Sequence, residues 1–483
     1  MEKKTEEYEI VVGLEVHAQL LTKTKLFSAD STEFGKEPNT QVSPITLGHP
    51  GTLPKLNKEA VRLAVRLGIA TNCDIVQRSF FARKNYFYAD LPKGYQISQH
   101  TTPICRNGFL EVSTGNEKRN IRINRIHIEE DAGKSIHDEE SEFSNVDFNR
   151  AGSPLVEIVS EPDIHSAEEA AEYVKNLRKL VRHLGVCDGN MEQGSLRCDV
   201  NISVRKKGDP KLGTKVELKN LNSIRFIRKA IEHESAEQIK QLEAGKRILQ
   251  QTKGFNDLTG GTYVIRTKED EDDYRYFPDP DLPPIVVSKE WIEEIKRDLP
   301  PTQQQIKQQL LDEYKLSEYD ATLLSEDVEL TDYYFRLVKE TTNYKAAANW
   351  MIGPVRNYCV SNDLSLQEFA IEPHSIGQLI ELIDKGNISY GIASQKVFDQ
   401  LTKNPSTDIE EYIKQNNLLL QSADETDKLI SIALNKHAEK ITEYKKGKKG
   451  LISLFVGEVM KLSSGKANAK QVTEKIIEKL KDY

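Results

Sequence analysis

The chain has 483 residues, of which 38% are hydrophobic and 29% are charged, and its formal net charge is −8 at pH 7. This length predicts roughly two to four domains. The sequence contains no run of about 18 apolar residues that could span a membrane. The negative net charge restricts nucleic-acid contact to a local basic patch. The five cysteines are scattered without a CxxC pair, which favours reduced thiols in the cytoplasm and argues against a thiolate metal site.

A strand is expected over residues 11–20, where apolar and polar side chains alternate. Its apolar face would lie against a core. Its other face carries Glu15, His17 and Gln19, so a carboxylate and an imidazole lie two residues apart. That pair suits a divalent cation or a proton transfer, but the solvated face of an ordinary strand has the same pattern.

Short β-type runs separated by turns continue to about residue 285, with only two clear helices, at 166–184 and 224–249. A mostly antiparallel sheet with a few helices packed on it, an α+β domain, is the expected architecture. The proline-rich segment 278–284 ends this region.

Beyond these prolines nearly every segment has a helical pattern. Thr407–Glu410 has the spacing of a capping box, which predicts a new helix after Asn404-Pro405. We therefore expect an α+β domain over residues 1–287, an all-α helical domain over 288–404, and a small helical tail domain over 405–483.

Three further strand-like runs place charged residues on sheet faces. Arg197 and Asp199 alternate with apolar residues in one run, and Glu217 and Lys219 do so in another. Glu157 is the single carboxylate in the apolar run 154–159. Burying an unpaired carboxylate forces a pKa shift, a partner or a metal.

Residues 126–131 add three acids at the end of a strand-like run. Alternation would put Glu130 on the core face with Ile126 and Ile128, but alternation often fails at strand ends, so its position stays open. Carboxylates, one imidazole and cations together suit Mg²⁺ with a nucleoside triphosphate. A sheet with one solvated polar face is the alternative, and it leaves Glu157 unexplained.

Two segments have a composition that suits nucleic acid. Residues 83–95 interleave four aromatic residues with three cations, which fits base stacking or a surface rim equally well. The segment from residue 435 to the end contains twelve lysines and six acidic residues, and the lysines are densest at 445–450. Such a run fits polyanion contact or simply a solvated face.

Several long motifs, in order along the first domain, resemble the GatB family, which forms one of the subunits of tRNA-dependent amidotransferases. The motifs are Gly13–His17, Arg83–Gln99, His127–Lys134, Val156–Asp163, Gly194–Asp199, Glu217–Ser223 and Asp272–Pro278.

The resemblance implies an enzyme acting on misacylated Glu-tRNA(Gln) or Asp-tRNA(Asn). Members of this family use ATP and Mg²⁺ to phosphorylate the side-chain carboxylate of the tRNA-linked amino acid. Ammonia, released from glutamine by a separate amidase subunit, then displaces the phosphate, and a small third subunit holds the other two together. A cradle-like sheet domain, a helical domain and a tRNA-binding tail are also implied.

Two other interpretations compete with this one. A non-catalytic RNA-binding scaffold would have no need of Glu157 or of the pair Glu15 and His17. A small-molecule ligase acting alone is disfavoured because the chain lacks a motif for releasing ammonia and has a basic tail.

The resemblance also implies the site residues, position by position. The Mg²⁺ and phosphorylation site falls on Glu15, His17, Glu130, Glu157 and Asp199. Of these, His17, Glu130 and Glu157 are expected nearest the metal, and Glu15 and Asp199 would position groups or hold a second ion. The residues expected around the nucleotide are Arg197, Glu217, Lys219 and Arg275. Lys84 and Lys93 would line the route toward the ammonia channel or the acceptor end. Contact with tRNA is expected at Lys445, Lys446, Lys448 and Lys449.

One departure from the family concerns zinc. Many members carry a zinc knuckle with Cys-x-Cys and Cys-x-x-Cys, whereas the corresponding segments here are 28–30 (Ser-Ala-Asp) and 43–46 (Ser-Pro-Ile-Thr). Without thiolates, no structural zinc is expected. The loop would then be held by packing alone.

Overall fold

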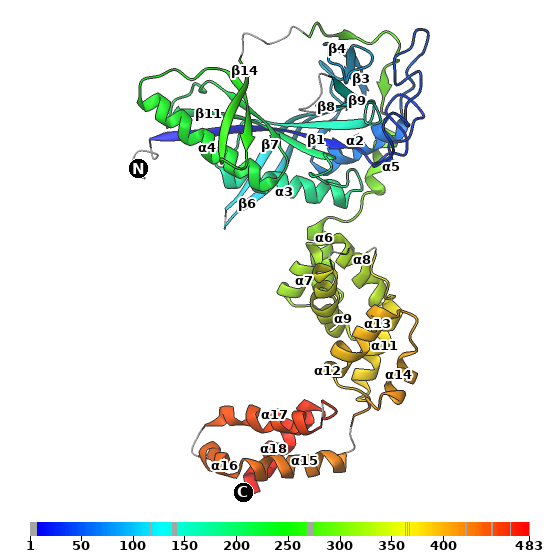
Figure 1. Cartoon of the computed structure of the whole chain (residues 1–483), viewed down its shortest axis with the longest axis vertical. Coiled ribbons are helices and arrows are strands. Elements are labelled where there is room, and N and C mark those ends of the chain that lie inside the picture. Colours follow the sequence, from blue (N-terminus) through cyan, green and yellow to red (C-terminus); the bar gives the residue numbers. More distant parts are fainter. Residues whose placement is uncertain are drawn as a thin grey trace. The chain divides into compact units, whose positions relative to one another are not determined.

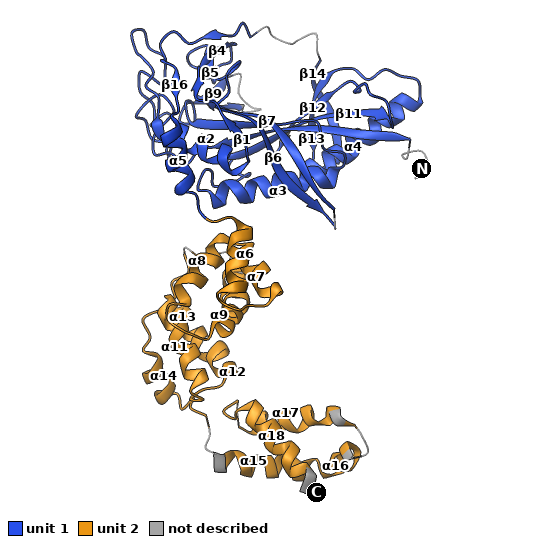
Figure 2. Cartoon of the chain, turned by 180° about the vertical axis from the view of Figure 1, so that it is seen from behind, with its two compact units in different colours: residues 1–300 blue, residues 301–483 orange. Residues whose placement is uncertain are grey.

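The computed structural model describes residues 7–482 except 116, 138–142, 268–273, 363, 365, 367, 421–422, 446–447 and 464. It divides into two compact units, residues 1–300 and residues 301–483 (Figure 2). The first unit holds the described strands, and the second is built from helices (Figure 1). The predicted order of an α+β region followed by an all-α region is therefore confirmed.

A nine-stranded sheet forms the framework of the first unit, in the order β14-β13-β12-β11-β1-β10-β7-β6-β2. Neighbouring strands are antiparallel except β12 and β13, which are parallel. The strands are β1 (Tyr8–Gln19), β2 (Asp74–Ile75), β6 (Cys105–Thr114), β7 (Glu117–Glu130), β10 (Pro154–Ser160), β11 (Leu196–Lys206), β12 (Val216–Leu221), β13 (Gln251–Asn256) and β14 (Gly261–Thr267).

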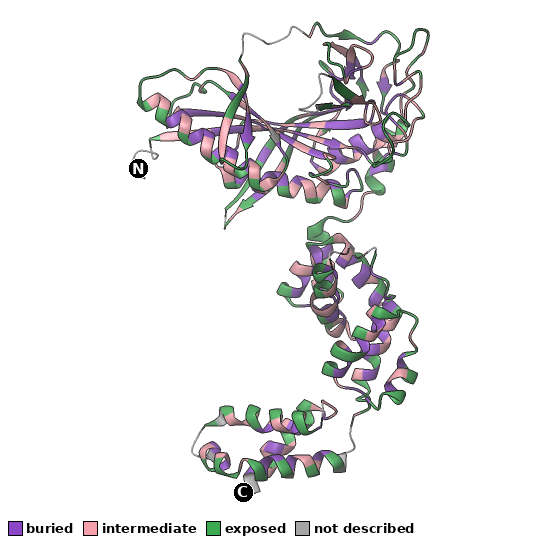
Figure 3. Cartoon of the chain, in the orientation of Figure 1, coloured by how far each residue is buried: buried purple, intermediate pink, exposed green. Residues whose placement is uncertain are grey.

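The strand predicted at residues 11–20 is β1, at the centre of this sheet. Its alternate residues Val12, Leu14 and Val16 are at most 1% exposed and belong to the main core. The helices α2 (Lys58–Ala70), α3 (Ala167–His183) and α4 (Ile224–Glu243) pack against strands of the same sheet (Figures 1 and 3). Because one face of β1 is committed to this core, its polar residues must lie on the opposite face.

Local sequence signals explain where these helices begin. Ser166 and Ser223 are the N-caps of α3 and α4, and each side chain accepts a hydrogen bond from a backbone N–H in the first turn. Helix α3 also has two glutamates in its first turn and basic residues in its last turn, which suits the helix dipole.

A small three-stranded sheet, in the order β15-β4-β5, contributes a second layer to the first unit. Its strands are β4 (Ala82–Asn85), β5 (Tyr95–Ser98) and β15 (Phe277–Pro278). Two further pairs join β3 (Arg78–Ser79) to β16 (Ile285–Val286) and β8 (Lys134–His137) to β9 (Ser144–Asp147). Arg83 fastens the layer, because its guanidinium donates to the carboxylates of Asp279 and Asp281 at 2.8 and 2.7 Å.

The first unit ends later than the sequence predicted. Helix α5 (Lys289–Arg297) packs against α2, and its Ile295 is 1% exposed in the core of the first unit. The division falls after Pro300 instead of near residue 287, because the apolar face of α5 is buried against the sheet domain.

The second unit contains two separate hydrophobic clusters, one over residues 306–418 and one over residues 430–480. The first cluster is built from α6 (Gln303–Asp312), α7 (Glu318–Ser325), α8 (Val328–Leu337), α9 (Tyr344–Trp350), α10 (Arg356–Ser361), α11 (Pro373–Asp384), α12 (Tyr390–Ile392), α13 (Phe398–Lys403) and α14 (Ile409–Gln415), with π-helical turns at Met351–Val355 and Ala393–Val397. The second is built from α15 (Ala423–Lys436), α16 (Ala438–Lys445), α17 (Ile452–Leu462) and α18 (Ala469–Asp482), with a 3-10 turn at Lys449–Leu451.

Helix α14 begins after Asp408, the N-cap within the predicted capping segment. Its Ile409 and Ile413 are 2% exposed and lie in the first helical cluster, together with Leu418. Helix α14 therefore packs with the helices that precede it. None of the helices within the described residues combines the length and apolar character that crossing a bilayer requires.

Candidate active site

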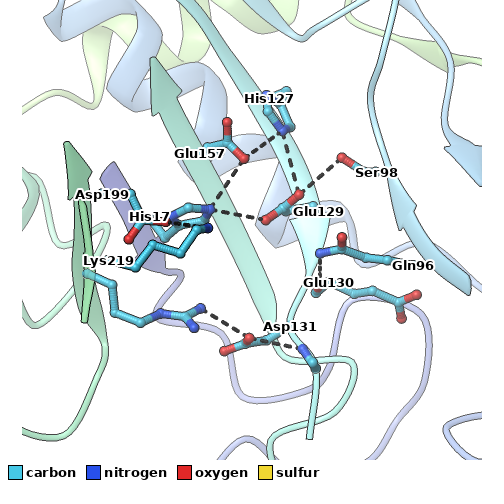
Figure 4. A network of polar contacts seen from close by, with 12 residues as sticks. His17, Gln96, Ser98, His127, Glu129, Glu130, Asp131, Glu157, Asp199 and Lys219 are labelled. Atoms are coloured by element: carbon cyan, nitrogen blue, oxygen red, sulfur yellow. Dashed lines mark hydrogen bonds and ion pairs between the residues drawn. The ribbon is translucent and has the colours of Figure 1, made fainter. Parts of the chain in front are cut away.

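Two histidines and two glutamates meet on the polar face of the central strands (Figure 4). In the sheet register His17 of β1 pairs with Glu157 of β10, and Glu157 pairs with His127 of β7. Glu129 lies two residues beyond His127 and therefore on the same face. We call His17, His127, Glu129 and Glu157 the acidic cluster.

The imidazoles and carboxylates of the acidic cluster are close enough to form ion pairs. The Nε2 atom of His17 is 3.3 Å from Glu157 Oε2 and 3.7 Å from Glu129 Oε1. The Nε2 atom of His127 is 3.4 Å from Glu157 Oε2 and 3.6 Å from Glu129 Oε2. Each carboxylate therefore lies between two imidazoles.

Burial and charge oppose each other in the cluster. Burial lowers the pKa of His127, but Glu157 and Glu129 outweigh it and raise that pKa to about 9. Burial raises the pKa of Glu157, but the two imidazoles outweigh it and hold that pKa well below its ordinary value. The Glu129 carboxylate is buried and the Glu157 carboxylate is half-buried, so both require positive charge beside them.

A divalent cation satisfies the same requirement. One atom each from His17, Glu129 and Glu157 lies within 4.8 Å of the other two, which is the spacing of ligands around one ion. Carboxylate oxygens suit both Mg²⁺ and Mn²⁺, and a neutral imidazole nitrogen is the commonest metal ligand among side chains. The donor set therefore fits the predicted metal.

Glu130, a predicted metal ligand, lies elsewhere. Its carboxylate points away from the acidic cluster (Figure 4) and accepts hydrogen bonds from Lys93 Nζ at 2.5 and 2.6 Å and from Ile97 N at 2.8 Å. Its position on β7 explains this, because alternation continues to the last residue of the strand, where Glu130 pairs with Pro154. The structure therefore brings Glu129, and not Glu130, together with His17 and Glu157.

Sequence reasoning missed both His127 and Glu129. The signal was present, since the two residues are two positions apart in a run whose other face, Ile126 and Ile128, is plainly apolar. Alternation alone would have selected Glu129, whereas transfer by resemblance selected its neighbour. What the sequence lacked was the register that places β7 beside β10.

A cavity of about 330 Å³ opens beside the acidic cluster toward β11 and β12. Lys219 extends from β12 to Asp199 at 3.0 Å and Glu217 at 3.1 Å. Burial lowers the pKa of Lys219, but these two carboxylates outweigh it and raise that pKa above its ordinary value. The predicted residues that line this cavity are His17, Lys84, Glu157, Arg197, Asp199 and Lys219.

Arg197 and Glu15 complete the polar surface of β1 and β11. Arg197 donates from Nη2 to Asp131 Oδ1 at 3.1 Å. Glu15 accepts from Asn201 at 2.9 Å, and burial together with the charge of Glu157 raises the Glu15 pKa. Glu15 stands opposite Asp199 in the register, so both remain next to the cluster without joining its three-ligand group.

The comparisons with known proteins bear on this site. The family model described as "GatB/GatE catalytic domain" matches residues 10–293, which include the whole acidic cluster, and a second, described as "GatB domain", matches residues 332–480. This chain belongs to the GatB family. The family prediction is therefore confirmed.

Curated relatives of the GatB family match along nearly the whole length. The B subunit of the aspartyl/glutamyl-tRNA(Asn/Gln) amidotransferase from Thermodesulfovibrio yellowstonii is 49% identical over 478 residues, covering 99% of this chain and 100% of the relative. The protein of the same name from Persephonella marina is 47% identical over 481 residues, covering 98% and 100%. This GatB chain thus matches those proteins from end to end.

The remaining predicted residues of this GatB chain are Lys84 and Arg275 in the first unit and the four lysines of the tail. Lys84 holds its ammonium 4.6 Å from the centroid of the Tyr274 ring. Arg275 is tied to β4, since its carbonyl accepts from Asn85 at 2.8 Å. In the tail, Lys445 ends α16 and Lys449 begins a 3-10 turn, while Lys448 pairs with Glu443 at 2.9 Å. Lys446 lies outside the described residues.

A network of hydrogen bonds joins the segments that correspond to the family's zinc knuckle. The Asp30 carboxylate accepts from Ser28 Oγ at 3.0 Å, from the Ser43 N–H at 2.9 Å and from Thr46 Oγ1. Ser28 and Thr46 also lie 3.1 Å apart through their hydroxyls. The loop is therefore held by a carboxylate-centred network, which corrects the expectation that packing alone would hold it.

We expect Asp30→Ala to lower the free energy of unfolding by about 2 kcal/mol at pH 7, because hydrogen bonds to a charged acceptor are lost. Burial raises the Asp30 pKa, but the three donors outweigh it and leave it below its ordinary value of 3.8. A lowered carboxyl pKa stabilises the fold above its unfolded pKa, and that stabilisation disappears as the pH falls through the folded pKa. Urea unfolding should thus show a deficit that is constant from pH 7 to about pH 5 and shrinks only as the pH falls below about 4, and that is absent in the exposed control Glu33→Ala.

Proposed function

We propose that this chain catalyses ATP-dependent activation and transamidation of misacylated Glu-tRNA(Gln), Asp-tRNA(Asn) or both. The acidic cluster carries this proposal, because it lies within the family's catalytic domain and next to a cavity with cationic walls. The names of the relatives support the substrate class, since they are aspartyl/glutamyl-tRNA(Asn/Gln) amidotransferases.

The chemistry requires a carboxylate to attack another anion. A side-chain carboxylate oxygen of the tRNA-linked amino acid bonds to the γ-phosphorus of ATP, and ADP leaves. Ammonia then attacks the acyl carbon, inorganic phosphate leaves, and the nitrogen loses a proton to give the amide. Both reactants of the first step are negatively charged, so the site must supply positive charge along the line of transfer.

The residues of the chain divide this task. His17, Glu129 and Glu157 would hold Mg²⁺, which neutralises the phosphate oxygens when bound. Lys219 and Arg197 line the cavity beside the cluster and would orient the nucleotide phosphates, while Asp199 and Glu217 fix the Lys219 ammonium. We propose that Glu15 and Asp199 position the groups around the metal or hold a second ion. We propose that Arg275 lies beside the nucleotide.

Lys93 and Glu130 suit the delivery of ammonia. Their ion pair borders a separate cavity of about 210 Å³ that is also lined by Lys25 and Arg83. Lys93 and Glu130 sit close to the acidic cluster, since Glu129 precedes Glu130 and lies on the other face of β7. We propose that the pair marks the route by which ammonia from the amidase subunit reaches the site, with Lys84 at the acceptor end.

The assembly that we propose is a cytoplasmic heterotrimer, in which this chain joins an amidase subunit through a small third subunit. The tail would bind tRNA through its lysines, among them Lys445, Lys446, Lys448 and Lys449, by neutralising backbone phosphates. Nucleic-acid binding of this kind weakens as salt rises.

Turnover by the purified heterotrimer tests the function. ATP, ammonia and either Glu-tRNA(Gln) or Asp-tRNA(Asn) are mixed, and ADP and amidated aminoacyl-tRNA are measured. We expect ADP formation to require the misacylated tRNA and to match the amide formed. Amide formation without ATP, or no ADP formation in the presence of the misacylated tRNA, would contradict the proposed activation and favour a scaffold role.

A further inference from the structure

A second and larger cavity, of about 590 Å³, adjoins the acidic cluster from the opposite direction. It extends toward the start of β6 and the C-terminal half of β7, whereas the 330 Å³ cavity extends toward β11 and β12. The strand order β12-β11-β1-β10-β7-β6 places the cluster, on β1, β10 and β7, between these two sides. Lys84, Glu129 and Glu157 line both cavities, so the cluster forms their shared wall.

Transfer of a phosphoryl group needs such an arrangement. The entering and leaving oxygens lie roughly in line through phosphorus, so donor and acceptor must approach the transferred phosphorus from opposite sides. The smaller cavity holds the half-buried Lys219 between two carboxylates, which suits a polyphosphate chain. The larger cavity is then left for the acceptor.

The lining of the larger cavity fits a nucleoside carrying an amino acid. His100 and Tyr276 form a stacked pair with ring centroids 4.1 Å apart and planes at 6°, and Tyr276 keeps 36% of its surface exposed. Aromatic faces of this kind stack on bases without reading sequence. Arg106 and Arg125 add cations to the same wall, and Arg125 Nη2 lies 3.9 Å from Glu157 Oε1.

We propose that the larger cavity binds the 3′-terminal adenosine of the aminoacyl-tRNA, with the base against the His100–Tyr276 pair and the amino acid reaching the acidic cluster. Arg125 lines the same cavity next to Glu157, where it would meet the negative charge of the side-chain carboxylate. This assignment rests on the proposed function and specifies which of its two nucleotide substrates occupies which cavity.

The test measures two Michaelis constants of the heterotrimer, KM for misacylated tRNA and KM for ATP, in each variant. His100→Ala is expected to raise KM for misacylated tRNA by on the order of tenfold, the loss of one base stack, and to leave KM for ATP unchanged. His100→Phe, which keeps an aromatic face, should restore KM for tRNA. Phe34→Ala, at a ring 71% exposed and outside both cavities, is the matched control.

Two results would overturn the assignment while leaving the proposed function intact. One is a raised KM for ATP with KM for tRNA unchanged, which would place the nucleoside triphosphate against the ring pair. The other is unchanged KM for both substrates in His100→Ala and Tyr276→Ala. Melting temperatures of the variants equal to that of the unaltered heterotrimer confirm that each comparison is made on folded protein.

Discussion

Glu157→Gln is expected to reduce ATP hydrolysis that depends on misacylated tRNA by on the order of 10²- to 10³-fold, because one ligand of the proposed metal loses its charge at the point of phosphoryl transfer. The Glu157 carboxylate also lies between the imidazoles of His17 and His127, at 3.3 and 3.4 Å, so no neighbouring acid can replace it without moving. Steady-state ADP release by the heterotrimer measures the effect.

The affinity of the same variant for tRNA should be unchanged, since the proposed tRNA-binding lysines lie in the second unit. Filter binding at fixed salt measures that affinity. Glu111→Gln on β6, an acid whose side chain is 55% exposed, is the control for loss of one carboxylate from the sheet. Normal turnover by Glu157→Gln would contradict the assignment of the acidic cluster to catalysis.

The neighbouring pair Glu129 and Glu130 gives the second large effect. Glu129→Gln is expected to weaken Mn²⁺ binding by about 10- to 100-fold, because it removes an oxygen from the three-ligand group. Glu130→Gln should leave Mn²⁺ affinity intact, since Glu130 bonds to Lys93 and Ile97 on the other face of β7. Electron paramagnetic resonance of free Mn²⁺ measures both affinities without any turnover.

Glu130→Gln should instead reduce amidation driven by glutamine, because the charge that holds Lys93 on the proposed ammonia route is lost. Its ATP hydrolysis should persist. A variant Glu130→Gln that lost Mn²⁺ as completely as Glu129→Gln would restore the ligand set inferred by resemblance and contradict the geometry of β7.

The sequence predicted the features that depend on local pattern. The alternation of residues 11–20 correctly placed Val12, Leu14 and Val16 in the core and left His17 on the polar face. The isolated charge of Glu157 pointed to a partnered site because a buried carboxylate demands a cation, and the structure supplies His17 and His127.

The features that the sequence missed depend on contacts between distant segments. Helix α5 belongs to the first unit because its Ile295 is buried in the core of that unit. The sequence pattern of the helix does not show which domain buries it. Asp30 accepts hydrogen bonds from Ser43 and Thr46, which are distant from it in the sequence. The sequence therefore did not predict the hydrogen bonds that hold this loop. The choice between Glu129 and Glu130 needed the pairing of β7 with β10.

In the proposed reaction a carboxylate oxygen of the tRNA-linked amino acid becomes bonded to phosphorus. The most direct measurement uses Glu-tRNA(Gln) or Asp-tRNA(Asn) labelled with ¹⁸O in the side-chain carboxylate, together with the heterotrimer, ATP and ammonia. Phosphorylation at that oxygen predicts one ¹⁸O atom in the inorganic phosphate for each labelled amide formed. Unlabelled phosphate, or label recovered in AMP, would contradict phosphorylation at the acidic cluster.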